Sequence, residues 1–227
     1  MGQKLGVRLD RETWDCLKLL CYWPLYGVVF FFAERVFRPE RFHVMHCWLD
    51  DLIPFCEVFL IPYLFWFAYL IGIHVYTFFC DRRAFQNLMR FIILSYTIGL
   101  VIFFAYPNCQ LLRPSVFPRD NLLTQFMASF YRFDTHTNVF PSLHVVGSMA
   151  VWYAARDTSL FENRNWRLFF HLSTLLISVS TVFLKQHSSL DLMGGVVVSV
   201  VSYGLVYRGQ ELQEAVCLRR SRRKFSW

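Results

Sequence analysis

The run Val58–Cys80 reads VFLIPYLFWFAYLIGIHVYTFFC and contains no charged residue. A helix needs about 20 apolar residues to cross the hydrocarbon core of a bilayer, so this run predicts a membrane-spanning helix. The run Phe91–Leu112 is long enough by the same measure. Four shorter charge-free runs depend on flanking polar side chains that reach the interface: Leu19–Ala33, Val139–Ala155, Leu168–Leu184 and Leu192–Tyr207. The sequence therefore predicts an all-α integral membrane protein, a bundle of six transmembrane helices.

The overall composition favours the same class. Of the 227 residues, 56% are hydrophobic and 17% are charged, whereas charged residues make up about a quarter of a soluble chain. The net charge of +7 does not indicate a nucleic-acid partner, because the basic residues form short clusters between apolar runs and match no recognition motif. The seven cysteines contain no CxxC pair and predict neither a zinc site nor a disulfide framework. We therefore expect the lipid bilayer as a partner and no nucleic acid.

Six spans place both chain termini on one side of the membrane. That side then carries 16 of the 23 Lys and Arg residues, and the positive-inside rule assigns it to the cytoplasm. We expect a cytoplasmic segment at 1–17, a membrane domain at 18–208 and a basic cytoplasmic tail at 209–227. The sequence does not predict an oligomeric state.

Three ionisable residues gather at the opposite, extracytoplasmic face. An ionised side chain inside a bilayer costs about 2.5–3.5 kcal/mol on insertion scales, so each such residue is a functional candidate. His144 begins the fourth span, His187 ends the turn after the fifth, and Asp191 begins the sixth. His187 and Asp191 are four residues apart and share one helix face if the helix starts by residue 187. An Asp that accepts from one imidazole nitrogen leaves the other free to attack; the alternative is a helix-capping or packing contact.

The segment Pro141–His144, with the sequence PSLH, is the second candidate motif. Proline and serine suit the first turn of a helix, where unpaired N–H groups and the helix dipole attract an anion. Because this motif and the His–Asp pair meet at one face, we predict a single site there.

These residues resemble the type-2 phosphatidic acid phosphatase superfamily, and most closely its branch of inositol phosphorylceramide synthases and sphingomyelin synthases. The matching segments are Asn138–His144 (NVFPSLH) and Lys185–Gly195 (KQHSSLDLMGG), and Arg113–Pro114 is a short match to the first family motif. The resemblance covers roughly residues 50–208. It implies a six-helix catalytic bundle of the type-2 phosphatidic acid phosphatase kind.

The resemblance also implies a role for each matching residue. His187 is the expected nucleophile and forms a phosphohistidine, and Asp191 orients it. His144 is the expected general acid and later the base, while Ser142 helps to hold the phosphoryl oxygens. No metal and no cofactor is expected, in keeping with a sequence that offers no carboxylate cluster suited to Mg²⁺.

Two departures from the family's phosphatase pattern favour headgroup transfer. Tyr106 stands seven residues before Arg113, where the phosphatases have Lys, and Thr181 stands six residues before His187, where they have Arg. A phosphodiester needs less neutralisation than a monoester dianion. We therefore expect transfer of a phosphoryl headgroup from a glycerophospholipid to a lipid alcohol, either ceramide or diacylglycerol.

The alternatives remain open at this stage. Lys185 or Arg113 could bind the phosphate in place of the missing cations, so a lipid phosphatase or phosphodiesterase that uses water is the first alternative. A lipid transporter or non-catalytic lipid-binding protein is a minor one. Glu57, near the same face, could bind the substrate headgroup or pair structurally with either cation. Three polar residues lie just before the second motif: Asp134, His136 and Asn138. We expect them to form a hydrogen-bonded loop network, which we favour over a role in gating the substrate.

Overall fold

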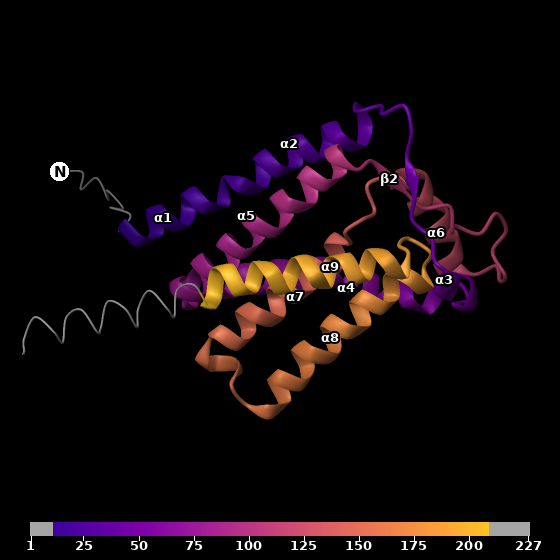
Figure 1. Ribbon diagram of the computed structural model, residues 1–227. Helices are drawn as coiled ribbons and strands as arrows, with labels where there is room; N and C mark the ends of the chain where they lie inside the picture. Colours follow the sequence, from indigo (N-terminus) through magenta and orange to yellow (C-terminus); the bar gives the residue numbers. More distant parts are fainter. Residues whose placement is uncertain (1–10, 209–227) are drawn as a thin grey trace, which may run out of the picture.

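The computed structural model describes residues 11–208, which are mainly helical (Figure 1). The helices of the bundle are α1 (Arg11–Leu20), α2 (Tyr22–Arg35), α4 (Leu60–Cys80), α5 (Arg82–Ala105), α7 (Leu143–Asp157), α8 (Arg164–Phe183) and α9 (Ser189–Tyr203). The other elements are β1 (His43–Val44), α3 (Trp48–Leu52), η1 (Glu57–Phe59), β2 (Asn108–Cys109), α6 (Leu122–Phe133), η2 (Ser159–Phe161) and η3 (Gly204–Arg208). The expected tail at 209–227 lies outside the described residues, as does most of the expected segment at 1–17.

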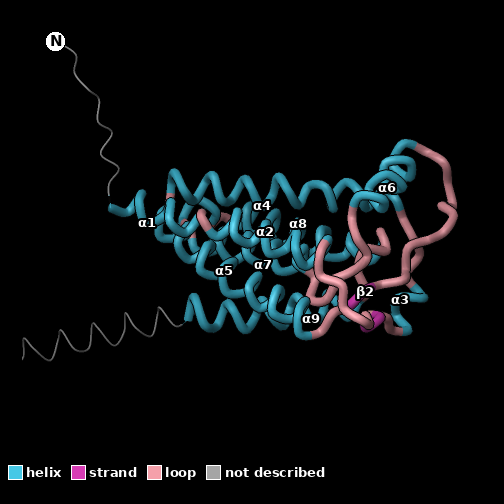
Figure 2. Tube along the Cα trace, turned by 90° about the horizontal axis from the view of Figure 1, so that it is seen from above, coloured by secondary structure: helices cyan, strands magenta, loops and turns pink. Residues whose placement is uncertain are grey.

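Loops and short elements cover one end of the helices. Figure 2 shows α3, α6 and β2 at this end, which we call the loop end. β1 and β2 pair in parallel there, with His43 opposite Asn108 and Val44 opposite Cys109. The opposite end, where α1 begins and η3 ends, is called the terminal end (Figure 1).

Five helical stretches are long and apolar enough to cross a membrane: Arg11–Arg35, Glu57–Cys80, Arg82–Ala105, Arg164–Phe183 and Ser189–Arg208. The prediction of six spans is not confirmed within residues 11–208. The run Val139–Ala155 corresponds to α7, which has only 15 residues. At 1.5 Å per residue α7 is about 22 Å long, whereas the hydrocarbon core is about 30 Å thick.

The short helix α7 lies at the centre of the bundle. It contacts α4, α5, α8 and α9, and Val146, Ala150 and Ala154 are fully buried. A Cβ at Gly147 would lie 2.7 Å from the Tyr96 hydroxyl and 3.0 Å from Trp66, so only glycine fits between these side chains. Protein therefore surrounds much of α7. Because a helix buried in protein needs apolar side chains just as a helix buried in lipid does, the sequence of α7 resembles that of a membrane span.

Three helix boundaries differ from those of the predicted runs. The charged segment 81–90, which separates the predicted runs Val58–Cys80 and Phe91–Leu112, forms the first turns of α5, because Asp81 caps the helix by accepting a hydrogen bond from the Ala84 N–H at 3.0 Å. α5 ends at Ala105, so the last residues of the run Phe91–Leu112 belong to β2 and the loops around it. The first helical stretch begins before the predicted run Leu19–Ala33, since α1 starts at Arg11 and α2 follows after a turn at Cys21.

Candidate active site

His187 and Asp191 are in contact at the loop end. α9 begins at Ser189, so His187 lies in the turn just before the helix, and Ser188 is the N-cap residue. The Nδ1 atom of His187 lies 3.3 Å from Oδ2 of Asp191. Asp191 is fully buried and His187 is 8% exposed. Since a carboxylate only accepts, Nδ1 carries the proton in this contact and Nε2 has a free lone pair.

The same carboxylate oxygen also caps α9. Oδ2 of Asp191 accepts a hydrogen bond from the Ser188 N–H at 2.8 Å, and the Ser188 hydroxyl accepts from the Leu190 N–H at 3.2 Å. This reciprocal arrangement is a capping box. The two alternatives that the sequence left open for this spacing, a helix cap and a His–Asp pair, are therefore both present. The cap fixes the carboxylate that faces His187.

His144 lies in the first turn of α7 and faces His187. The centroids of the two imidazole rings are 5.7 Å apart. The His144 ring stacks on Tyr63, with centroids 4.5 Å apart, and lies 4.6 Å from the ring of Trp66. Its Nε2 is buried and has no hydrogen-bond partner within residues 11–208. Aromatic packing therefore orients the ring and leaves one nitrogen available to a ligand.

Ser142 belongs to the same cluster. It is fully buried at the N-cap of α7, and its backbone N–H donates to the Asp191 carbonyl at 3.0 Å. A Cβ at Gly195 would lie 2.8 Å from the Ser142 carbonyl oxygen, so glycine allows α9 to approach α7 closely. The Ser142 hydroxyl has no partner in the part of the chain that the structure describes. The two sequence motifs thus meet through backbone contact.

A cavity of ≈ 90 Å³ lies beside the two histidine rings. Its lining comes from α2, α4, the segment before α7, α7 itself and the turn between α8 and α9. Among the described residues that line it, two are carboxylates, Glu34 and Asp134, and none is Lys or Arg. Acidic side chains and apolar ones, such as Phe30 and Leu143, therefore line the cavity beside the histidines.

Glu34 is a cavity residue that the sequence reasoning missed. One carboxylate oxygen accepts a hydrogen bond from Asn138 Nδ2 at 2.6 Å, and the other accepts from the Thr135 hydroxyl. The Oδ1 atom of Asn138 is buried without a partner among residues 11–208. Glu34 did stand out in the sequence, but only as the charged residue that ends the first apolar run.

Asp50 is the second residue that was missed. It is 2% exposed, and its carboxylate accepts from the Ser189 N–H at 2.7 Å, the Ser189 hydroxyl at 2.8 Å and the Ser188 hydroxyl at 2.5 Å. Although burial alone would raise the pKa of Asp50, hydrogen bonds from Ser188, Ser189 and Cys47 lower it. Asp50 thus anchors the turn that carries His187.

None of the four residues predicted to bind substrate lines this cavity: Ser142 is buried at the N-cap of α7, and the other three have partners elsewhere. Lys185 instead donates to the backbone carbonyl of Asp50 at 2.7 Å. Glu57, 3% exposed, pairs with Arg119 at 2.7 Å, and not with either of the two cations proposed from the sequence. Arg113, the third, has a different set of contacts.

Arg113 fastens the loop after α6 to the turn before α9. Its guanidinium donates to the carbonyls of Tyr131, Asp134 and Thr135 and, at 2.6 Å, to Oε1 of Gln186. It also lies 3.5 Å from the Asp134 carboxylate. Burial raises the pKa of Asp134, and the charge of Arg113 opposes that rise. Arg113 therefore holds wall residues of the cavity in place without lining the cavity itself.

No group of three or more His, Cys, Asp or Glu side chains within residues 11–208 is arranged to hold a metal ion. A family model described as the PAP2 superfamily matches residues 34–205. The matched range begins at Glu34 and contains both histidines, Asp191 and Asp50. Comparisons with curated proteins and with solved structures find no match.

Proposed function

The chain belongs to the PAP2 superfamily, and from this membership we propose that it is a membrane lipid phosphotransferase. Members of this superfamily are generally phosphatases or phosphotransferases, which suggests activity on lipid phosphates. The proposed reaction moves a phosphoryl headgroup from a glycerophospholipid to a lipid alcohol, either ceramide or diacylglycerol. The observation that carries this choice is the charge of the cavity beside His144 and His187.

The carboxylate of Glu34 in the cavity wall disfavours a substrate with two negative charges. At a separation of about 6 Å and an effective dielectric constant of about 20, two unit charges interact by about 3 kcal/mol. A phosphomonoester near pH 7 carries up to one more negative charge than a phosphodiester. Glu34, when ionised, therefore penalises the monoester by up to about that amount more than the diester, whereas Arg113, 3.5 Å away, offsets the charge of Asp134.

In the first half of the proposed reaction, Nε2 of His187 attacks the phosphorus of the donor lipid. The bond between phosphorus and the diacylglycerol oxygen breaks, and His144 donates a proton to that leaving oxygen. Asp191, 3.3 Å from Nδ1, stabilises the positive charge that the ring gains. The products are diacylglycerol and a headgroup phosphate, now a monoester, linked to His187 through a P–N bond.

In the second half, the hydroxyl of the acceptor lipid attacks the same phosphorus. His144, now neutral, takes the hydroxyl proton, the P–N bond breaks and His187 is regenerated. The packing of Tyr63 and Trp66 against His144 supports an acceptor that arrives from lipid, because these rings exclude water from that side of the imidazole.

We further propose that the protein crosses the membrane several times, with both termini in the cytoplasm and the loop end at the extracytoplasmic face. Several apolar helices suggest a membrane-embedded protein. The excess of Lys and Arg on the terminal side supports the orientation.

The test uses purified full-length protein in mixed micelles. Phosphatidic acid, phosphatidylcholine, phosphatidylethanolamine and phosphatidylinositol are offered as donors, and ceramide and diacylglycerol as acceptors. Products are identified by lipid mass spectrometry beside a free-phosphate assay, with His187→Ala as the blank. A new phospholipid that requires His187 supports the transferase. Release of free phosphate from phosphatidic acid without a new lipid would establish a phosphatase instead, and no product at all would favour a transporter or binding protein.

A further inference from the structure

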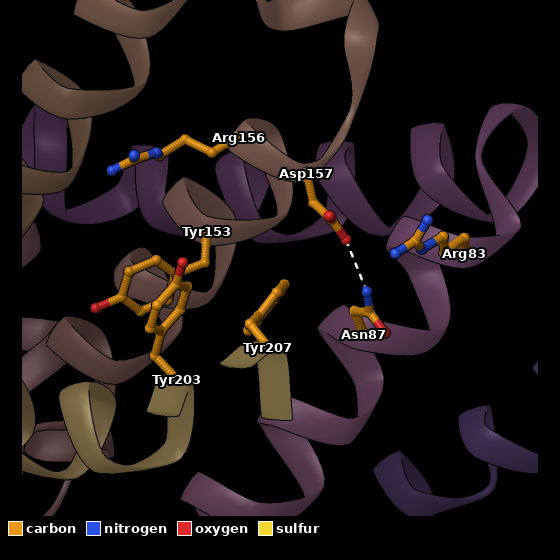
Figure 3. A pocket seen from close by; sticks show the side chains of 7 residues that line it. All are labelled: Arg83, Asn87, Tyr153, Arg156, Asp157, Tyr203 and Tyr207. Carbon is orange, nitrogen blue, oxygen red and sulfur yellow. Dashed lines mark hydrogen bonds between the residues drawn. The ribbon is translucent and has the colours of Figure 1, made fainter. Parts of the chain in front are cut away.

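A cavity of ≈ 180 Å³ lies at the terminal end of the bundle, between α5, α7, α9 and η3 (Figure 3). Polar side chains line it, but they do not converge on one ligand. Figure 3 shows Arg83 and Arg156 on opposite sides of Asp157. The Arg156 guanidinium lies over the ring of Trp152, 5.3 Å from its centroid, and Asp157 accepts a hydrogen bond from Asn87 at 2.8 Å. The cavity beside the histidines differs, because two hydrogen-bond acceptors lie side by side in its wall.

Asn138 lines the cavity beside the histidines and has a side-chain oxygen without a partner. Its Nδ2 donates to Oε1 of Glu34 at 2.6 Å and to the Ala33 carbonyl at 3.3 Å. These two acceptors fix the orientation of the amide, which leaves Oδ1 as the free acceptor. Asn138 is 7% exposed, and Oδ1 has no hydrogen-bond partner among residues 11–208. A buried acceptor without a donor is unfavourable, so a ligand that brings an N–H or O–H group to this oxygen stabilises the site.

The backbone holds Asn138 in place independently of its side chain. Its N–H donates to the Asn108 carbonyl at 2.7 Å, and Oδ1 of Asn108 accepts from the Phe140 N–H at 2.8 Å. Asn138 has a φ of 53°, in the left-handed region that asparagine and glycine adopt most readily. Glycine at this position therefore preserves the backbone conformation while it removes the amide.

Glu34 places a negative charge beside the free oxygen. Because one hydrogen bond joins the two side chains, the carboxylate and Oδ1 of Asn138 are neighbours. Glu34 is partly buried, and its hydrogen-bond donors, Asn138 and Thr135, are neutral. The adjacent Arg35 is exposed and donates to the Phe133 carbonyl at 2.5 Å. No Lys or Arg is found among the described residues that line the cavity, so a cation bound there supplies the missing opposite charge.

We propose that this pair of acceptors binds the headgroup of the donor lipid, and that this headgroup carries a primary ammonium group, as in an ethanolamine phospholipid. The inference rests on the proposed transferase function and specifies its donor. An ammonium group brings a positive charge and three N–H donors, which serve Oδ1 of Asn138 and the Glu34 carboxylate together. A quaternary choline group has the charge without an N–H, and a polyol headgroup has donors without a charge. The pair retains the headgroup while its phosphate is attached to His187.

The experiment measures how tightly full-length His187→Ala protein, which cannot form the P–N bond, binds short-chain lipids in detergent micelles. The titrated lipids are phosphatidylethanolamine, its N-methyl and N,N-dimethyl forms, phosphatidylcholine and phosphatidylglycerol, and binding is followed as saturable thermal stabilisation. We expect the affinity to fall with each methyl group, because each removes one N–H donor, and to differ about ten-fold or more between the ends of the series. Phosphatidylglycerol, which has hydroxyl donors and no cation, should bind about ten-fold or more weakly than phosphatidylethanolamine.

Two variants in the same background separate the roles of the acceptors. Asn138→Gly keeps the left-handed backbone and should reduce the preference for phosphatidylethanolamine over phosphatidylcholine about three- to ten-fold. Glu34→Gln removes the charge and should reduce the preference over phosphatidylglycerol by a similar factor. The matched control is Glu40→Gln, which removes an exposed carboxylate that does not line the cavity and should change neither preference. Each variant is compared at its own unfolding temperature without added lipid.

The methylation series needs no variant at 34 or 138, so it decides the question even if a variant does not fold. Equal affinities for phosphatidylethanolamine and phosphatidylcholine, or no saturable binding of any lipid, overturn the inference. Equal effects of Glu40→Gln and Glu34→Gln also overturn it. Headgroup transfer by the wild-type protein is measured separately: transfer without an ethanolamine preference leaves the transferase and removes this inference. An ethanolamine preference in binding without any transfer leaves the headgroup site and removes the transferase.

Discussion

Replacing Asp50 with Asn tests whether a buried carboxylate on α3 positions the nucleophile. Its Oδ2 accepts from the Cys47 N–H at 2.9 Å and the Ser188 hydroxyl at 2.5 Å, and its Oδ1 accepts from the Ser189 N–H at 2.7 Å and the Ser189 hydroxyl at 2.8 Å. Each carboxylate oxygen thus faces one backbone N–H, which can only donate. Whichever way the Asn amide turns, its NH₂ group opposes one of these N–H groups.

The expected cost follows from this geometry. Losing one hydrogen bond to a charged group costs about 1.5–3 kcal/mol, and the opposed N–H groups add to it. The turn that carries His187 then shifts away from Asp50. Because a misplacement of about 1 Å can cost about 10²-fold in rate, we expect Asp50→Asn to lower kcat by about that factor with little change in KM.

The assay is the steady-state rate of headgroup transfer in mixed micelles, measured beside the unfolding temperature. Asp51→Asn is the matched control, because Asp51 is the next residue, is exposed, and contacts His46 at 2.8 Å away from the site. It should remain within about two-fold of the wild-type rate, since surface substitutions have small effects. Full wild-type kcat in Asp50→Asn, in a protein shown to be folded, would refute the positioning role.

The remaining predictions concern charge, orientation and topology. Asp191→Asn should lower the rate about 10⁴-fold, as tautomer errors do in His–Asp pairs, and a normal rate would make the contact purely structural. Glu34→Gln should raise activity on phosphatidic acid relative to phosphatidylcholine by about ten-fold or more, measured with both lipids; an unchanged ratio contradicts the electrostatic argument. Burial raises the pKa of Asp134, so the folded state favours its protonated form and stability is lost as pH rises from the ordinary value of about 3.9 through the folded pKa. Unfolding temperatures across that range should fall less in Asp134→Asn than in wild type, and identical curves count against the shift. Val116 is 81% exposed on the loop end, so Val116→Cys should react with an impermeant thiol reagent from outside intact cells. Labelling only after permeabilisation would contradict the proposed orientation.

Local features of the sequence predicted much of the fold and the centre of the site. Charge-free runs predicted the membrane helices, because hydropathy depends on residue type alone. His187 and Asp191 are in contact, but His187 lies in the turn before α9, so the capping box rather than a shared helix face brings the two side chains together. The count of spans was not confirmed, because an apolar run does not reveal whether lipid or protein surrounds it, and α7 is surrounded largely by protein.

Only the tertiary structure decided which charged groups face the cavity. Glu34 meets Asn138 across 104 residues and Asp50 meets Ser188 across 138, so no local pattern could reveal either contact. Arg113 and Lys185 have the charge that a phosphate site requires, but in the fold each donates to backbone carbonyls. The sequence by itself therefore determined which residues could do the chemistry, because residue type fixes nucleophilicity and charge. The fold determined which of them meet, because a charged side chain takes the partners that packing brings within reach.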